Sequence, residues 1–167
     1  MKTAFLLMML TAAPLAALAD SPDATFYKHA AEGGMFEVDA GMMAQDKGST
    51  QAVKDFGAMM VKDHGAANEK LKSLAASKSV SLPSSASVGQ MATKAKLDVL
   101  SGDTFDKSYI KSQVQAHRQT IALFKKEIAT GQDADAKSFA TDTLPTLRAH
   151  MQAIKKIAAD AGVSTKK

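Results

Sequence analysis

The stretch "AMMVKDHGAANEKL", residues 58–71, has the spacing of an amphipathic helix that packs against other helices. Its apolar side chains recur at Met60, Ala67 and Leu71, which is the period of one helix face. Between the first two, where the pattern calls for another apolar side chain, the residue is His64. The stretch therefore predicts a core-facing helix that carries an imidazole on its apolar face.

Three other long segments show the same helical period, and no segment alternates with the period of two that is typical of strands. Glycine and proline are sparse, so the composition also favours an all-α fold. Proline lacks a backbone donor, so Pro145 is expected to kink the last helix or to split it. The predicted helices cover residues 22–45, 50–76, 103–130 and 133–161.

The connections between these predicted helices differ in length. The first and second helices, and the third and fourth, are joined by a few residues, so each pair is expected to be antiparallel. The second and third are joined by a serine-rich loop and a short helical pattern at residues 91–100. A link of this length can cross the whole bundle. The sequence thus predicts two helical hairpins joined by a long crossover with a short extra helix.

The first residues, "MKTAFLLMMLTAAPLAALAD", have the parts of a secretory signal: an early lysine, an apolar run and a small-residue cleavage pattern. We interpret residues 1–19 as a signal peptide and residues 20–167 as one domain. No later stretch approaches the apolar length of a transmembrane helix. The predicted location is therefore periplasmic or secreted, with peripheral envelope association left open.

Several function classes are disfavoured by what the sequence lacks. It has no cysteine, which excludes thiolate chemistry and cysteine-ligated metals. Its formal net charge is +4, but the lysines are spread along helical faces without interleaved aromatic residues, so no nucleic-acid partner is predicted. No phosphate-binding loop or serine elbow is present, so no organic cofactor and no catalytic residues are predicted.

Each predicted apolar face is interrupted by one residue of a strong metal-ligand type. These residues are Glu37, His64, His117 and His150. The first three lie near the midpoints of their predicted helices and the fourth slightly beyond its own. In a bundle of helices of similar length, midpoints share one level whichever way the chain runs. We therefore expect the four side chains to meet at mid-bundle.

Two arrangements would satisfy these buried polar groups. In the first, one divalent metal such as zinc, copper or iron binds the three imidazoles and the carboxylate, in a structural, storage or sensing role. In the second, the four groups form a hydrogen-bond network with water, in a metal-free envelope or stress-related interaction protein. An enzyme is a third alternative, but four ligands leave no open position for a substrate unless Glu37 moves away.

Three other polar residues near these faces are not assigned to the predicted site. Asp63 is adjacent to His64 and does not point the same way, so it is interpreted as a surface charge. His29 is expected to face solvent, and Glu32 to line the edge of the bundle. A ferritin-type two-metal site is not expected, because no glutamate lies three residues before any of the three histidines of the set.

A resemblance to a known family rests on two strings, "FYKHAAEGGMFEVDAGMMA" at residues 26–44 and "LPTLRAHMQAIK" at residues 144–155, and on the two predicted histidine-bearing helices between them. The chain resembles the exported bacterial family called domain of unknown function 4142, often labelled as outer-membrane proteins and grouped with the ferritin-like four-helix bundles. The resemblance implies that fold but no chemistry. Members often have acidic residues where this chain has Ala116 and Ala149, which weighs against neighbouring carboxylates assisting the site.

Overall fold

Five helices make up most of residues 22–165, the part of the chain described by the computed structural model. No strand occurs within that range. The predicted signal peptide, residues 1–19, lies outside it. None of the helices within the range combines the length and hydrophobicity that a bilayer crossing requires. In chain order the helices are α1 Pro22–Lys47, α2 Gln51–Ser77, α3 Val88–Asp98, α4 Gly102–Thr130 and α5 Ala134–Asp160.

The four long helices agree with the predicted ranges to within two residues at each end. The short helix α3 begins three residues earlier than predicted, at a capping box in which Ser87 and Gln90 bond each other's backbone N–H groups. Of the two alternatives for Pro145, a kink or a split, the split is wrong, since α5 runs through the proline without interruption. Leu144 and Leu147 on either side of the proline are buried, and this packing outweighs the loss of one backbone hydrogen bond.

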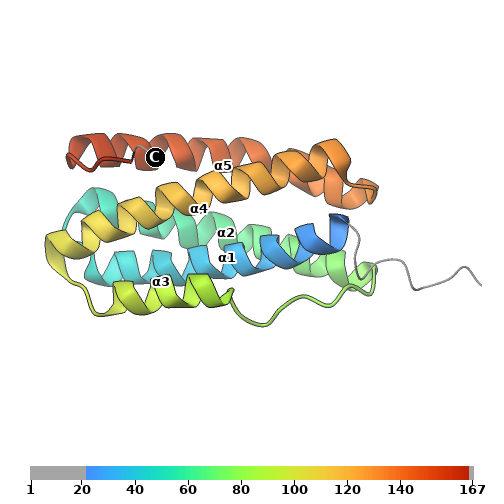
Figure 1. The fold of residues 1–167 in the computed structure, drawn as a ribbon, viewed down its shortest axis with the longest axis horizontal. Coiled ribbons are helices and arrows are strands. Elements are labelled where there is room, and N and C mark those ends of the chain that lie inside the picture. The colour runs from blue at the N-terminus through green and yellow to red at the C-terminus, as the bar shows by residue number, and fades with distance from the viewer. Residues whose placement is uncertain (1–21, 166–167) are drawn as a thin grey trace, which may run out of the picture.

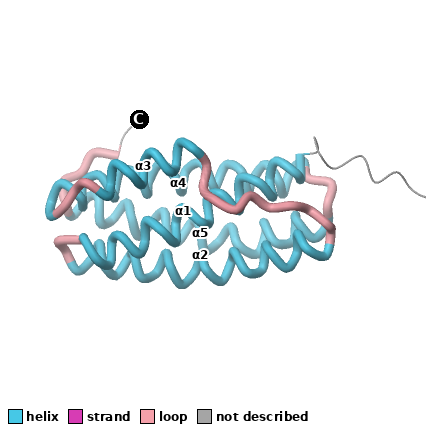
Figure 2. The backbone as a smooth tube through the Cα atoms, turned by 90° about the horizontal axis from the view of Figure 1, so that it is seen from below, coloured by secondary structure: helices cyan, strands magenta, loops and turns pink. Residues whose placement is uncertain are grey.

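The long helices lie lengthwise beside one another (Figure 1). The hairpin partners α1 and α2 pack together, as do α4 and α5, and the hairpins contact each other through α1 with α4 and α2 with α5. The crossover from α2 leads through a long loop into α3, which lies on the outside against α1 and α4 (Figure 2). Two helical hairpins and a crossover are therefore observed.

A close backbone approach fixes the spacing within the first hairpin. A Cβ atom at Gly57 would lie 2.6 Å from the carbonyl oxygen of Gly41, and one at Gly41 would lie 2.7 Å from the carbonyl oxygen of Gly57. Neither position can carry a side chain without moving a helix, so the two glycines let α1 and α2 pack with their backbones nearly in contact.

The apolar core forms two clusters, one towards each end of the bundle. One contains Met60, Val114 and Ile154, and the other contains Leu71, Phe124 and Leu147. On α2, α4 and α5 the three buried histidines lie in sequence between members of these two clusters. A polar layer thus separates two apolar halves.

A buried aspartate on α4 holds the turn between α1 and α2. The Asp106 carboxylate accepts four hydrogen bonds of 2.8–3.0 Å, from the backbone N–H and the hydroxyl of both Ser49 and Thr50. Thr50 is the N-cap residue of α2, but its own side chain makes no capping bond. The two residues that lead into α2 are therefore held by a side chain of the other hairpin.

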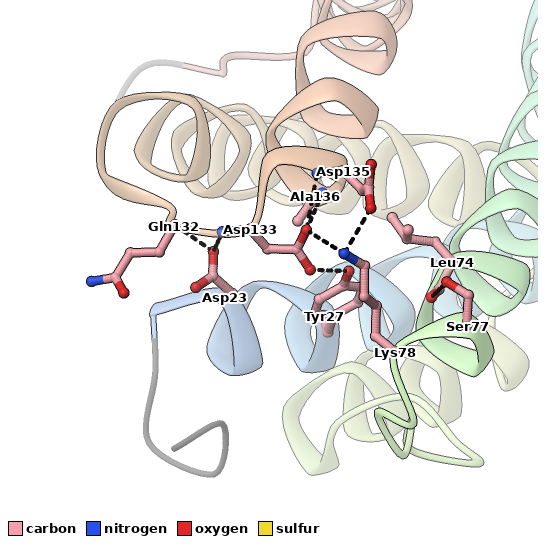
Figure 3. Close-up of polar contacts among 9 residues, drawn as sticks. All are labelled: Asp23, Tyr27, Leu74, Ser77, Lys78, Gln132, Asp133, Asp135 and Ala136. Atoms are coloured by element: carbon pink, nitrogen blue, oxygen red, sulfur yellow. Dashed lines mark hydrogen bonds and ion pairs between the residues drawn. The ribbon is translucent and has the colours of Figure 1, made fainter. Parts of the chain in front are cut away.

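At the opposite end, a second buried aspartate ties the start of α1 to the α4–α5 turn (Figure 3). Asp23 Oδ1 accepts hydrogen bonds from the backbone N–H groups of Gln132 and Asp133 at 2.8 and 3.0 Å. Asp133 in turn accepts a hydrogen bond from the Tyr27 hydroxyl at 3.0 Å and pairs with Lys78 at 3.2 Å. These contacts join α1, the end of α2 and the second hairpin.

A third acidic residue at this end of the bundle, Glu127, lies next to Asp23. Burial raises the pKa of Glu127 to about 7, and the neighbouring Asp23 carboxyl adds to the rise. Burial also acts to raise the pKa of Asp23, but its two backbone donors outweigh this and the pKa lies below the ordinary value. The pair is therefore arranged so that Glu127 holds a proton beside an ionised Asp23.

This pair predicts a pH dependence of stability. Between pH about 4.5 and about 7 folded Glu127 keeps a proton that the unfolded chain has released, so the free energy of unfolding falls as pH rises through this window. We expect Glu127→Gln to reduce the decline in melting temperature between pH 5 and pH 8. Glu69→Gln, an exposed change on α2, is the control. Equal slopes for the wild-type protein and Glu127→Gln would contradict the assignment.

Candidate metal centre

Three imidazoles converge at mid-bundle, one from each of α2, α4 and α5. His64, His117 and His150 are all buried, and their ring centroids are 5.4–5.7 Å apart. One ring nitrogen of each lies within 4.8 Å of those of the other two. Within residues 22–165 this is the only group of three or more His, Cys, Asp or Glu side chains with ligand atoms so close together.

Two of the rings are held in place by acceptors on their outer side. The Nδ1 of His117 lies 3.0 Å from the carbonyl oxygen of Gln113, one helical turn earlier. The Nε2 of His150 lies 2.9 Å from the Asp63 carboxylate on α2. Both oxygens only accept hydrogen bonds, so these ring nitrogens carry the protons. The opposite nitrogen of each ring is left with a free lone pair.

One further nitrogen of each ring has no hydrogen-bond partner. They are Nε2 of His64, Nε2 of His117 and Nδ1 of His150, and all three are buried. If His64 presented an N–H group, it could donate to only one of its two neighbours. A buried acceptor left without a donor costs about 1–3 kcal/mol. The arrangement has the donor set that an imidazole-binding metal requires.

Burial also keeps these rings in the form that binds metal. Burial lowers the pKa of His64 to about 3, and the proximity of His117 and His150 adds to the shift. Burial likewise lowers the pKa of His117 to about 4, against a smaller opposing effect of its bond to the Gln113 carbonyl. At neutral pH both rings are therefore neutral, and a metal need not displace a proton from either.

Glu37, the fourth residue of the predicted set, lies beside this group and not within it. It is buried, and its Oε1 is 3.6 Å from Nδ1 of His117, the nitrogen that faces away from the other imidazoles. Burial raises the pKa of Glu37 to about 8, partly offset by the Gln113 side chain. The structure thus brings three of the four predicted residues together and leaves the carboxyl on the outer side of His117.

The prediction for Asp63 is wrong. Asp63 was expected to be a surface charge because it does not share a direction with His64 on the same helix. Its carboxylate instead reaches across to His150 on α5. A residue beside the core-facing stripe of one helix faces the edge of the next helix. The place of Asp63 next to His64 in the sequence was therefore the available signal. His29 is half-exposed and Glu32 lines the edge of the bundle, as expected.

Asp63 is expected to tune the affinity of the site for metal. A carboxylate that accepts the outer N–H of a ligating histidine fixes the ring and raises its basicity, and its loss weakens metal binding by about 10–100-fold. We expect Asp63→Asn to weaken zinc binding by this factor in a competition titration with a chelating dye. Asp55→Asn, an exposed change on the same helix, should leave the affinity unaltered. An unchanged affinity in Asp63→Asn would show that this contact does not support a ligand.

The walls around the three imidazoles are largely apolar. Phe56 packs edge-on against the rings of His117 and His150, with centroids 6.1 and 6.5 Å away. A cavity of about 20 Å³ adjoins His64, and Asn68, Thr120 and Thr143 are its other polar wall residues. A space of this size holds one water molecule. Three imidazoles with a neighbouring water-sized space suit zinc, copper, nickel or iron, with one coordination position left open.

These features define an all-helical protein with a buried cluster of histidines. The sequence profile of DUF4142, a domain of unknown function, matches residues 8–157, and the chain belongs to this family. No curated protein matches the sequence. The match gives no support to an outer-membrane location.

Two solved structures have similar folds. One is a DUF305 protein from Streptomyces coelicolor, described as a candidate secreted protein, with a TM-score of 0.75 and 15% identity, covering 89% of this chain and 99% of that one. The other is a DUF305 fragment from Deinococcus radiodurans, with a TM-score of 0.73 and 10% identity, covering 83% of this chain and 96% of that one. At these identities the likeness shows a shared helical fold alone.

Proposed function

We propose that this DUF4142 protein is an exported, ferritin-like four-helix bundle that binds one divalent metal ion through His64, His117 and His150. The bound ion has a structural, storage or sensing role. Zinc, copper and iron are the candidate metals, since imidazole nitrogen suits all three. The domain comprises residues 20–167 after removal of a signal peptide, residues 1–19.

The convergence of three ring nitrogens without partners carries the proposal. A water molecule has two hydrogens and can satisfy two lone pairs, whereas one metal ion satisfies all three. Two further features favour the metal. The outer nitrogens of His117 and His150 have the oxygen partners that ligating histidines usually have. Burial also keeps His64 and His117 neutral.

The fold and the location rest on separate observations. Two helical hairpins with one long crossover are the arrangement of ferritin-like bundles. Export is supported by the signal-like start of the sequence and by the description of the Streptomyces coelicolor relative as a candidate secreted protein. Glu37 stays a predicted fourth ligand, which would have to move to the inner side of His117. With three ligands the open position would bind water, and we propose no catalytic role for it.

Metal content is the direct test of this function. The full-length protein, exported and purified without chelator, should contain close to one equivalent of a transition metal by elemental analysis. The His64→Leu variant, prepared in parallel, should contain much less. His29→Leu should retain the metal, because His29 is half-exposed and belongs to no cluster of ligand atoms. Absence of metal from the wild-type protein, with no uptake of added zinc, copper or iron, would defeat the proposal.

The second candidate is a metal-free interaction protein, and the cavity beside His64 favours it. One water there could bond His64 and begin the network that the sequence also allows. In this case His64→Leu should melt at the same temperature as the wild-type protein or higher, because an apolar side chain fits the core-facing stripe. A metal site predicts the reverse when metal is present.

A further inference from the structure

A second site lies on the opposite side of α1 and α4 from α2 and α5, where α3 covers the groove between them. It is a cavity of about 510 Å³ lined by residues of α1, the start of α3 and the middle of α4. Pockets that hold small organic molecules are usually about 300–1,000 Å³. The crossover brings α3 back against α1 and α4 (Figure 2). The cavity between these three helices is large enough for a ligand.

Two of the three titratable side chains that line this cavity are acidic. Glu32 and Glu37, both on α1, are buried carboxyl groups at its wall. None of the described residues that line it is a lysine or an arginine, although the chain contains 21 of these residues. The only basic group is His29, whose Nδ1 lies 2.9 Å from Glu32 Oε2. A carboxylate or phosphate ligand would meet no fixed cation here.

One of these carboxyl groups is incompletely bonded. Glu37 is 99% buried and its Oε2 has no hydrogen-bond partner. A buried polar atom of this kind normally has a donor supplied by the protein, by water or by a ligand. The remaining polar wall residues are neutral hydroxyls and amides: Ser87, Gln90, Thr93, Ser112, Gln115, Gln119 and Thr120.

We propose that this cavity binds a small organic cation with N–H donors, of the diamine or polyamine class. One ammonium group pairs with Glu32 and, once the Glu37 carboxyl turns towards the cavity, donates to the free oxygen of Glu37. The rest of the ligand lies along the hydroxyls and amides of α3 and α4. A bare metal ion is not the ligand favoured here, because the carboxyl and imidazole atoms of this wall do not form a cluster with metal-ligand spacing. The assignment does not depend on metal at the three histidines.

The charge of the ligand gives a sharp test. Isothermal titration of the chelator-treated full-length protein with 1,4-diaminobutane should show binding of one molecule per chain. Butane-1,4-diol has the same length and no charge, and succinate has the opposite charge, so neither should bind detectably. Equal affinity for the diol, or no heat with the diamine, would overturn the proposal.

Two variants separate binding in this cavity from general attraction to acidic residues. Glu32→Gln should weaken diamine binding by about tenfold or more, since it removes the charge that pairs with the ligand. Ala116→Leu fills the cavity from α4 without changing charge and should also weaken it. Glu69→Gln removes a carboxylate from a different cavity, between α1 and α2, and should change nothing. Wild-type affinity in both cavity variants, or equal loss in Glu69→Gln, would show that the diamine binds elsewhere.

Discussion

Adding zinc to the chelator-treated protein is expected to raise its melting temperature by about 10 °C. A ligand at a free concentration one thousand times its dissociation constant stabilises the folded state by about 4 kcal/mol. For a domain of this size, each kcal/mol corresponds to about 2–4 °C. The three imidazoles come from α2, α4 and α5, so the ion would link both hairpins through helices that carry most of the two core clusters.

The controls for this shift use the other histidines of the chain. His117→Leu removes the central ligand and should abolish most of the increment, whatever its effect on the protein without metal. His29→Leu should show the full increment, because His29 is half-exposed and pairs only with Glu32. An increment that survives in His117→Leu but is lost in His29→Leu would place the zinc on the surface and contradict the buried site.

Asp106→Ala is expected to be strongly destabilising, costing about 3 kcal/mol. It removes four hydrogen bonds to a buried carboxylate and leaves the backbone N–H groups of Ser49 and Thr50, just before α2, without their acceptor. Chemical denaturation monitored by circular dichroism should show the midpoint fall with an unchanged slope.

The matched control for this change is Asp103→Ala. Asp103 lies one turn earlier on α4 but is exposed, and it pairs only with Lys107 at 2.7 Å. An exposed pair of this spacing contributes about 0.3–0.5 kcal/mol. Similar losses in Asp103→Ala and Asp106→Ala would mean that the α1–α2 turn is not held by the Asp106 carboxylate.

Much of the fold could be predicted because helical periodicity is a local property of the sequence. The spacing of apolar side chains in residues 58–71 predicted both the helix α2 and the buried position of His64. The lengths of the connections predicted which helices are neighbours. The meeting of His64, His117 and His150 followed from their similar depth along helices of similar length. Each of these inferences needed only the helical repeat and chain length.

The features that could not be predicted all depend on contacts between helices. Helical periodicity gives the face of α2 on which Asp63 lies. It does not give the rotation of α5 about its axis, which brings His150 within hydrogen-bonding distance of Asp63. In the same way, nothing local shows that Asp106 bonds the residues before α2 in the other hairpin. The orientation of Glu37 depends on how α1 packs against Gln113 and His117. The continuity of α5 through Pro145 could not be predicted either, because the packing of its buried neighbours is a tertiary effect.

The most direct measurement is an anomalous-difference map from crystals of the exported protein grown with one equivalent of zinc. The account predicts one strong peak between His64, His117 and His150, about 2.0–2.1 Å from one ring nitrogen of each. The same map would show whether the Glu37 carboxyl has turned inward to become a ligand. A map without a peak at this position, or with its strongest peak on surface side chains, would contradict the claim that the buried imidazoles form a metal site.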